Sequence, residues 1–356
     1  MNQKNVLLLF GGVSPEHDIS IKSVTSVASL LGNHMVIPVY ITPAGSWLMY
    51  DGKLDNLQNL NWDKFGIPAI LSPDRKNNGG LLRIMGDKVK NIPIDVVLPI
   101  LHGPNGEDGT IQGLCQLAGI PFIGCGVTAS AVAMDKAITK LVAKGLKIPQ
   151  ADYLSFEADQ FEMDSPSILT KIGRKIGYPA FVKPAIGGSS IGISKANNRK
   201  ELTEAIIEAL KYCHKVVIEK SITGREIEVG ILGTGMAAKA SAIGEILSSE
   251  DCNFYDFEAK YNSPKSETVV PADLPDEIAQ KIQDYALAIY RGIGASGLSR
   301  VDFFVEESGK IYFNEINTMP GFTNISMYAK MWEASGISRQ DIIDILIMIA
   351  TDGAEA

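Results

Sequence analysis

Long apolar runs are missing from this chain of 356 residues. Its longest stretches, among them 6–10 and 345–350, cover about five or six residues, whereas a helix needs roughly 18 to cross a bilayer. The first stretch continues directly into Gly11 and Gly12 without a cleavage site of small residues, so it predicts an opening strand rather than a signal peptide. We therefore expect a cytoplasmic protein that does not act on a membrane.

Cysteine and histidine are also scarce. The four cysteines (Cys115, Cys125, Cys213 and Cys252) form no C-x-x-C pair and the four histidines are scattered, which argues against a disulfide framework and a zinc site. Basic residues are outnumbered, because 33 Lys and Arg against 41 Asp and Glu give a net charge of -8. This charge disfavours a nucleic-acid partner but allows a locally basic pocket for an anionic ligand.

Apolar residues make up 46% of the chain and charged residues 21%, which is typical of a globular protein with a sizeable core. Single cores rarely exceed about 250 residues, so the length indicates more than one domain. Strand and helix patterns predict an α/β fold with α+β elements in three domains. An N-terminal βαβ domain would span 1–124, a small central domain 125–222 and a larger C-terminal domain 223–356.

Helix boundaries and one long loop can be predicted within these domains. Thr128 is expected to cap a helix that continues to residue 146, and Ser165-Pro166 to start another that ends before Gly177. The polar stretch 248–270 shows no clear periodicity. Loops of this length are usually functional or disordered, so we interpret it as a lid.

Three glycine-containing segments imitate known signatures, but each lacks a feature that its signature requires. The G-x-G-x-x-G at 292–297 follows a helix and precedes a strand, so it predicts a helix end rather than a dinucleotide site. The string at 124–129 lacks a later acidic residue to hold a ribose, which disfavours a dehydrogenase. The G-x-S-x-G at 188–192 precedes a strand pattern and has no Asp before His214, so no hydrolase triad assembles. Gly-Lys is never followed by Ser or Thr, which excludes a Walker P-loop.

The strongest chemical signal lies in the segments SRVDFFVE and IYFNEINT. Glu315 and Asn317 are two residues apart and share one strand face, and Asp302 lies across from them if the ESGK turn forms a hairpin. The alternative is a solvated polar face, but both strands are otherwise apolar. Hard oxygen donors around a shared carboxylate predict one or two Mg²⁺ ions.

A second signal combines a cation with a glycine-rich loop. Lys183 ends the strand pattern AFVK and is followed by GGSSIG, whose amides and hydroxyls suit a phosphate. The alternative is an ordinary flexible hairpin. Lys136 in MDK and the pair Glu219-Lys220 add charges that are by default solvated surface groups.

Together these segments resemble the D-alanine:D-alanine ligase family of the ATP-grasp superfamily, nearly from end to end. The resemblance rests on eight motifs in order: FGGVSPEHDIS (10–20), LHGPNGEDGTIQG (101–113), AVAMDK (131–136), FVKPAIGGSSIGISKA (181–196), VIEKSITGREIEVGIL (217–232), FYDFEAKY (254–261), GLSRVDFF (297–304) and NEINTMPGFTNISMY (314–328).

The resemblance implies that ATP lies between the central and C-terminal domains. Its phosphates would meet lysines and the GGSSIG loop, its adenine Glu219 and Lys220, and its ribose Glu226. The implied nucleotide contacts are Lys136, Lys183, Ser189, Ser190, Glu219, Lys220, Ile222, Glu226, Phe254, Lys260, Asn314 and Glu315. Asp302, Glu315 and Asn317 would hold two Mg²⁺ ions, with Mn²⁺ as a substitute, in agreement with the strand pattern.

The implied reaction forms an acyl phosphate on one D-alanine and joins it to the amine of a second, releasing ADP and phosphate for peptidoglycan precursor synthesis. Arg300 and the backbone N–H of Gly321 would stabilise the oxyanion. Glu16 would bind the first ammonium group, Ser326 with Met327 the second substrate, and His102 lies near the substrate. Glu16, Ser189 and Tyr261 would form a hydrogen-bonded chain to the lid.

Several alternatives remain open at this stage. The retained pair Lys260-Tyr261 favours an amine over D-lactate as second substrate, but D-serine and other carboxylate-amine ligations stay compatible. A nucleotide-binding regulator without catalysis is the alternative from another class, although it has no use for an oxyanion donor such as Arg300. A homodimer is compatible with a sequence that leaves the oligomeric state open.

Overall fold

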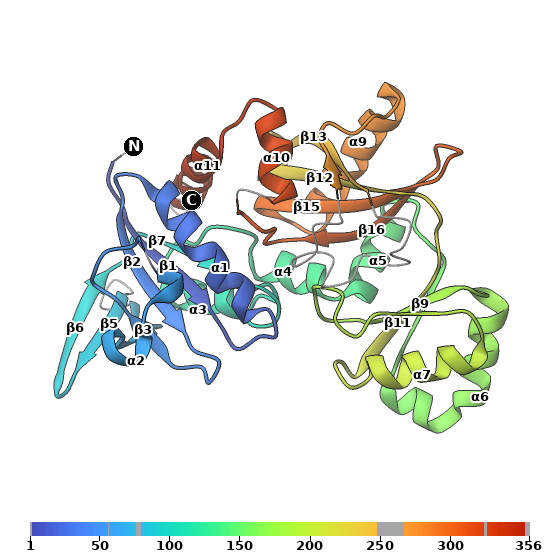
Figure 1. Ribbon diagram of the computed structural model, residues 1–356, viewed down its shortest axis with the longest axis horizontal. Coiled ribbons are helices and arrows are strands. Elements are labelled where there is room, and N and C mark those ends of the chain that lie inside the picture. Colours follow the sequence, from blue (N-terminus) through green and yellow to red (C-terminus); the bar gives the residue numbers. More distant parts are fainter. Residues whose placement is uncertain (1, 56, 76–79, 248–266, 324–325, 353–356) are drawn as a thin grey trace.

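The computed structural model describes residues 2–55, 57–75, 80–247, 267–323 and 326–352. The described strands form three sheets of seven, four and five strands. In Figure 1 the first sheet lies at the left, the second at the lower right and the third above and between them. The mixed α/β class predicted from the sequence is confirmed.

The first sheet has the strand order β6-β5-β4-β3-β2-β1-β7. Its strands are β1 (Asn5–Gly11), β2 (Met35–Ile41), β3 (Trp47–Met49), β4 (Ile67–Ser72), β5 (Gly80–Met85), β6 (Lys88–Pro93) and β7 (Val96–Ile100). Strand β1, next to the edge strand β7, pairs in parallel with β2 and β7, as the predicted βαβ opening requires. The remaining neighbours are antiparallel.

Helices cover both faces of β1. The helices of this region are α1 (His17–Ala28), α2 (Trp62–Phe65) and α3 (Thr110–Ala118), with 3-10 turns at Ser29–Leu31 and Leu57–Asn59. Val6 and Leu8 share a core with α1, whereas Leu7 and Leu9 share one with α3. Successive strand residues point to opposite faces, which explains why β1 is apolar throughout. The loop after β1 thereby reaches the start of α1, where Glu16 lies.

The second sheet is antiparallel, with the order β10-β9-β11-β8. Its elements are β8 (Tyr153–Glu157), α6 (Ala158–Lys175), β9 (Ala180–Pro184), β10 (Ser194–Ala196), α7 (Arg199–Ala209) and β11 (Lys215–Lys220). Val182 and Ile218 belong to the core beneath α6 and α7. Their neighbours Lys183 and Glu219 therefore point to the opposite face of the sheet.

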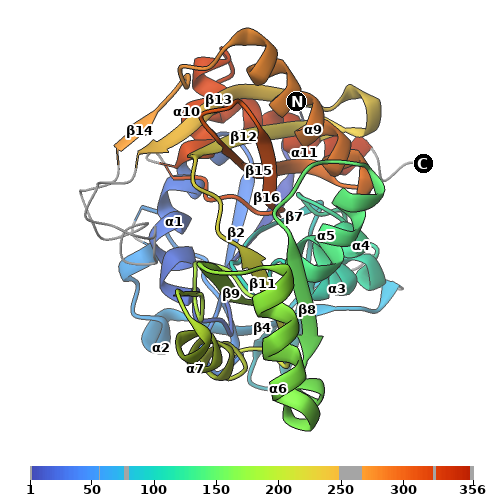
Figure 2. The same cartoon turned by 90° about the vertical axis from the view of Figure 1, so that its right-hand side faces the viewer.

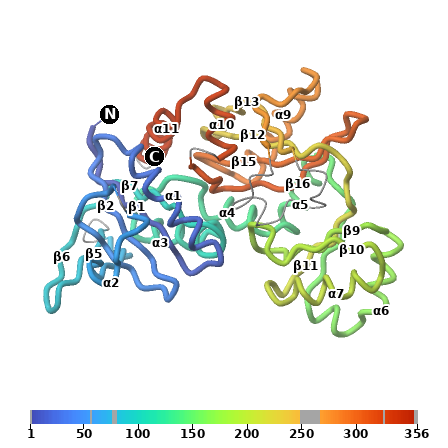
Figure 3. The backbone as a smooth tube through the Cα atoms, viewed as in Figure 1, coloured from blue at the N-terminus to red at the C-terminus, as the bar shows by residue number. Residues whose placement is uncertain are grey.

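The third sheet is also antiparallel, with the order β14-β13-β12-β15-β16. Its elements are β12 (Arg225–Thr234), a 3-10 turn (Gly235–Ala237), β13 (Lys239–Leu247), β14 (Glu267–Val269), α9 (Asp276–Gly292), β15 (Ser296–Val305), β16 (Ile311–Asn317), α10 (Met327–Ala334) and α11 (Arg339–Asp352). Helix α9 covers one face, and α10 and α11 cover the other. Helix α11 also packs on the core of the first sheet, as the red end of the tube beside the blue region in Figure 3 shows.

Of the two helices predicted by their boundaries, one is wrong and the other is confirmed. In place of one helix from Thr128, the structure has α4 (Val127–Met134) and α5 (Lys136–Gly145). They are separated by Asp135, whose side chain accepts hydrogen bonds from the first amides of α5. The span of α6 holds two helical segments separated by the non-helical Asp164 (φ -151°, ψ 63°), whose side chain accepts a hydrogen bond from the amide of Ser167 at 3.1 Å. A helical segment therefore starts at Ser165-Pro166 and ends before Gly177, as predicted.

Other expectations are confirmed or fall outside the described residues. The string at 292–297 does end a helix, since α9 stops at Gly292 and Gly294 has a left-handed φ of +70°. Within the predicted lid, residues 267–269 form strand β14, and 248–266 lie outside the described residues.

Cys115, Cys125 and Cys213 are buried free thiols. Among the described helices, none combines the length and apolarity needed to span a bilayer.

Candidate active site

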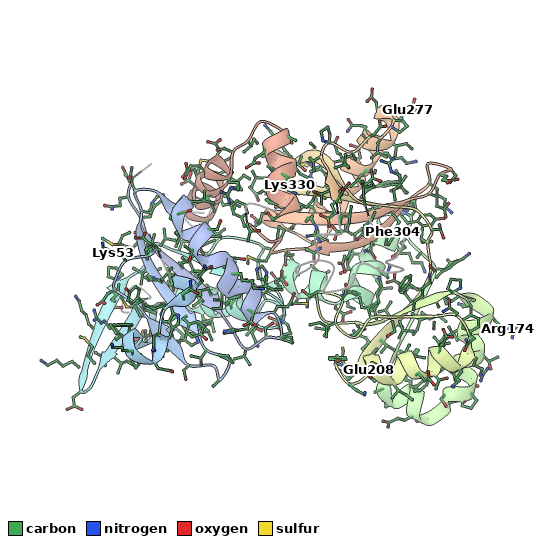
Figure 4. The ribbon with its side chains drawn as sticks, viewed as in Figure 1. Lys53, Arg174, Glu208, Glu277, Phe304 and Lys330 are labelled. Carbon is green, nitrogen blue, oxygen red and sulfur yellow. The ribbon has the colours of Figure 1, made fainter. Side chains whose placement is uncertain are left out.

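Two neighbouring cavities lie along β15 and β16. The larger cavity, about 450 Å³, lies between the second and third sheets and includes Lys183, Glu219 and Asn314 in its lining. Figure 2 shows β9 and β11 facing β15 and β16 across this region, and Phe304, labelled in Figure 4, belongs to its lining. The smaller cavity, about 310 Å³, lies between the first and third sheets and includes Glu16, Lys136 and Arg300. Glu315 lines both cavities, so it marks their junction.

Most predicted nucleotide contacts line the larger cavity. They are Lys183, Ser190, Glu219, Lys220, Ile222, Glu226, Asn314 and Glu315. Lys136 and Ser189 line the smaller cavity, together with the predicted substrate contacts Glu16, His102, Arg300, Gly321, Ser326 and Met327. Phe254, Lys260 and Tyr261 lie outside the described residues.

The hairpin of β15 and β16 brings the predicted metal ligands together. Asp302 pairs with Glu315 and Arg300 with Asn317, and a bulge follows Asp302. The amide of Asn317 donates to Asp302 Oδ2 at 3.0 Å, which places an amide oxygen and two carboxylates at one end of the hairpin. No three His, Cys, Asp or Glu side chains within the described ranges cluster as a metal site, so the set depends on Asn317 as a third donor. Two carboxylates and an amide oxygen fit Mg²⁺.

Arg300 is fixed by two acidic side chains. Its Nε and Nη2 donate to the two oxygens of Asp302 at 2.8 and 2.7 Å, and Glu228 Oε2 lies 3.2 Å from Nε. Burial alone would lower the pKa of Arg300, but Asp302 and Glu228 raise it. These contacts use Nε and Nη2, so Nη1 takes no part in the paired hydrogen bonds to Asp302.

A buried group of alternating charges lies at one wall of the larger cavity, with Lys183, Glu219 and Asn314 in the lining and Lys140 behind them. Lys183 Nζ donates to Glu219 Oε2 at 3.0 Å and to Asn314 Oδ1 at 3.2 Å. Lys140 Nζ lies 3.2 Å from the other oxygen, Glu219 Oε1. Burial would raise the pKa of Glu219, but Lys140 and Lys183 outweigh it and lower the pKa to about 2. Glu219 is therefore a carboxylate over the physiological pH range.

The glycine-rich loop after β9 joins both cavities. Ser189 and Ser190 have left-handed φ values of 50° and 59°, a conformation that non-glycine residues rarely adopt and that often marks functional loops. Ser189 donates a hydrogen bond to Glu16 Oε1. Lys136, the first residue of α5, donates to Gly187 O at 2.6 Å, and its Nζ lies 3.9 Å from Glu315. The loop therefore connects Glu16 of the first region with Lys136 and the hairpin.

Acidic groups gather at the first-sheet end of the smaller cavity. Burial, with Glu16 nearby, raises the pKa of Glu107 to about 8, although the amide of Gly103 donates to it at 3.0 Å. Glu107 therefore holds its proton more tightly than an exposed glutamate does. Glu16 is the second carboxyl group at this end and belongs to the lining of the same cavity.

Three residues of this site escaped sequence reasoning. Lys140 follows Lys136 by one helical turn, Glu107 lies inside the motif GED, and Glu228 alternates with apolar residues of β12. The spacing of Lys140 and the alternation at Glu228 were available signals. Neither signal tells a buried charge from a solvated one without the tertiary partners Glu219 and Arg300.

His102 provides a test of the site's effect on stability. Burial lowers its pKa from 6.5 to about 4. On acidification the unfolded chain therefore binds a proton near pH 6.5, before the folded chain does, so stability falls as the pH decreases through this window. Between pH 7 and pH 5 we expect the free energy of unfolding of the wild type to fall by about 2 kcal/mol more than that of His102→Gln. In thermal unfolding this appears as a smaller decrease of Tm in the variant. His214→Gln, at an exposed histidine, is the control, and parallel Tm curves for wild type and His102→Gln would contradict the assignment.

Comparison with family models and known proteins shows which family has a chain of this kind. The model of the D-ala D-ala ligase N-terminus matches residues 5–125, and that of the C-terminus matches residues 142–348. The chain belongs to the D-alanine:D-alanine ligase family. A D-alanine--D-alanine ligase of Acetivibrio thermocellus is 47% identical over 98% of this chain and 96% of its own length. One of Caldicellulosiruptor bescii is 45% identical over 99% and 96%.

Solved structures of this ATP-grasp ligase family share the fold. The VanG D-Ala:D-Ser ligase from Enterococcus faecalis has a TM-score of 0.87 and 34% identity, covering 98% of this chain and 100% of that one. The D-alanine-D-alanine ligase from Coxiella burnetii has a TM-score of 0.84 and 31% identity, covering 100% and 96%. The resemblance seen in the sequence is thereby confirmed, and the predicted multi-domain architecture is consistent with these neighbours.

Proposed function

We propose that this protein ligates two D-alanines in an ATP-dependent reaction through an acyl phosphate, releasing ADP and phosphate and supplying a dipeptide for peptidoglycan precursors. The observation that supports this most is the shared Glu315. It joins a cavity lined by Lys183, Glu219 and Asn314 to a cavity lined by Glu16 and Arg300. A triphosphate in the first would meet an amino acid in the second at this point.

In this proposal the larger cavity takes ATP. Lys183 would bind phosphate oxygens, together with Lys136 and the amides and hydroxyls of the loop that holds Ser189 and Ser190. The carboxylate of Glu219 would accept from the adenine amino group at the cavity wall. Lys220, Ile222 and Glu226 would complete the site toward adenine and ribose.

The residues of the hairpin fit Mg²⁺. Arg300 and Lys136 lie near three carboxylates, those of Glu228, Asp302 and Glu315. Because these carboxylates offset the two cations, the side chains alone do not neutralise the charge of an incoming triphosphate. Asp302, Glu315 and Asn317 would hold the ions. Bound Mg²⁺ supplies charge neutralisation at the phosphates.

The smaller cavity would orient the amino acids. Glu16, fixed by Ser189, would bind the ammonium group of the first D-alanine and direct its carboxylate toward the γ-phosphate. A carboxylate oxygen bonds to that phosphorus as ADP leaves. The amine of the second D-alanine then attacks the acyl carbon, and phosphate departs.

Stabilisation of the second step would come from Arg300 and Gly321. Because Asp302 and Glu228 hold the guanidinium, Nη1 is preorganised to donate to the oxyanion that forms on the acyl carbon. The backbone N–H of Gly321 would donate from the opposite loop. Ser326 and Met327 at the start of α10 would receive the second substrate.

Phosphate release tests the proposal. With ATP and Mg²⁺ we expect D-alanine alone to elicit phosphate and ADP in step with a D-alanine dipeptide. D-Serine and D-lactate, each offered with D-alanine, decide the second substrate, and predominant D-alanyl-D-serine would identify a D-serine ligase. Production of AMP and pyrophosphate, or ATP binding without turnover, would contradict the proposal.

A further inference from the structure

Lys140 is a buried cation that the proposed function leaves without a role. It lies one turn after Lys136 in α5 and is 1% exposed. It belongs to the lining of neither cavity described above. Its Nζ lies 3.2 Å from Glu219 Oε1 and 5.4 Å from the centre of the Tyr153 ring. Lys140 therefore contacts Glu219 from behind the cavity wall.

The contacts of Lys183 depend on how the two carboxylate oxygens of Glu219 are divided between Lys183 and Lys140. An ammonium group has three N–H donors. Glu219 Oε2 and Asn314 Oδ1 take two of those of Lys183 at 3.0 and 3.2 Å, which leaves one for the cavity. Because Lys140 attracts Oε1, only one oxygen of the carboxylate engages Lys183.

The balance of charge in this buried group also favours a free positive charge on Lys183. Lys140, Lys183 and Glu219 are all buried, and two cations face one anion. Of these two lysines, Lys183 is the one in the cavity lining, so a ligand in the cavity contacts Lys183 directly and Lys140 only at a distance. Without Lys140, Lys183 and Glu219 would form a neutral pair whose carboxylate is free to take a second donor of Lys183.

We infer that Lys140 is a positioning residue that holds Glu219 and thereby keeps Lys183 positive and available to a nucleotide phosphate. This inference rests on the proposed ATP site. A purely structural role would need only a side chain of this volume, and a buried methionine supplies that volume without the desolvation cost of an ammonium group.

The test separates phosphate binding from nucleoside binding. In Lys140→Met we expect ATP affinity, measured by calorimetry with Mg²⁺, to fall by about tenfold, the order of one weakened charge-assisted hydrogen bond. Adenosine lacks phosphates and reports only on the contact of Glu219 with adenine, so its affinity should fall clearly less than that of ATP. Lys144→Met, at an exposed lysine one turn further along α5, is the matched control. Lys140→Gln, neutral yet polar, should show the same phosphate-specific loss, which keeps the test valid if the methionine variant folds poorly.

A second measurement tests the route through Glu219. In a Glu219→Gln background the neutral amide cannot neutralise Lys183, so adding Lys140→Met should cost clearly less ATP affinity than it does in the wild type. Equal losses in both backgrounds, equal losses for ATP and adenosine, or no loss would overturn the inference. A wild-type protein that does not bind ATP would instead refute the proposed function.

Discussion

Replacing Glu315 by glutamine is expected to lower turnover by at least roughly 100-fold, because a shared metal ligand supports several kcal/mol of transition-state stabilisation. Glu315 lies opposite Asp302 and lines both cavities. The substitution keeps the size of the side chain and removes its charge. Steady-state turnover at saturating ATP and D-alanine is the measurement, and nucleotide affinity should suffer less than turnover.

Glu208→Gln is the matched control for this variant. Glu208 lies on α7, as Figure 4 shows, and belongs to neither cavity. We expect it to leave turnover unchanged. Near-normal turnover of Glu315→Gln at ordinary Mg²⁺ would contradict the placement of metal at this hairpin.

Replacing Arg300 by lysine is expected to lower turnover by about 100-fold while the KM for ATP changes little, because an oxyanion donor acts in the transition state. Lysine keeps the positive charge between Asp302 and Glu228. It lacks the planar fork that engages both oxygens of Asp302 at 2.8 and 2.7 Å and still presents Nη1. The split between kcat and KM is the informative readout.

Arg83→Lys provides the control for that substitution. Arg83 pairs with Asp51 at 2.7 Å in the first sheet, away from both cavities. Its replacement should leave kcat and KM unchanged. If Arg300→Lys retained normal kcat, or lost only ATP affinity, the proposed role of Arg300 at the oxyanion would be wrong.

The central hairpin could be predicted from the sequence because its determinants are local. The two-residue spacing of Glu315 and Asn317 fixes one strand face, and the short ESGK turn brings Asp302 opposite. The continuous apolar run of β1 and the glycine-rich loop after Lys183 are likewise local patterns. For such elements, neighbours along the chain already determine the arrangement.

Other features depend on contacts that are distant in the sequence. The break at Asp135 is stabilised by Lys215, 80 residues away, with which it forms an ion pair. The burial of Lys140 depends on Glu219 and Tyr153, and the fixed guanidinium of Arg300 depends on the register of β12 with β15. Helix periodicity and strand alternation contain no information about these partners.

The most direct test of the central claim follows the oxygen of the first carboxylate. D-Alanine labelled with ¹⁸O in its carboxylate would be ligated with ATP and Mg²⁺, and the released phosphate analysed by mass spectrometry. Activation as an acyl phosphate predicts that each dipeptide formed transfers one ¹⁸O atom to inorganic phosphate. Label found in AMP, or phosphate free of label while dipeptide accumulates, would contradict the account.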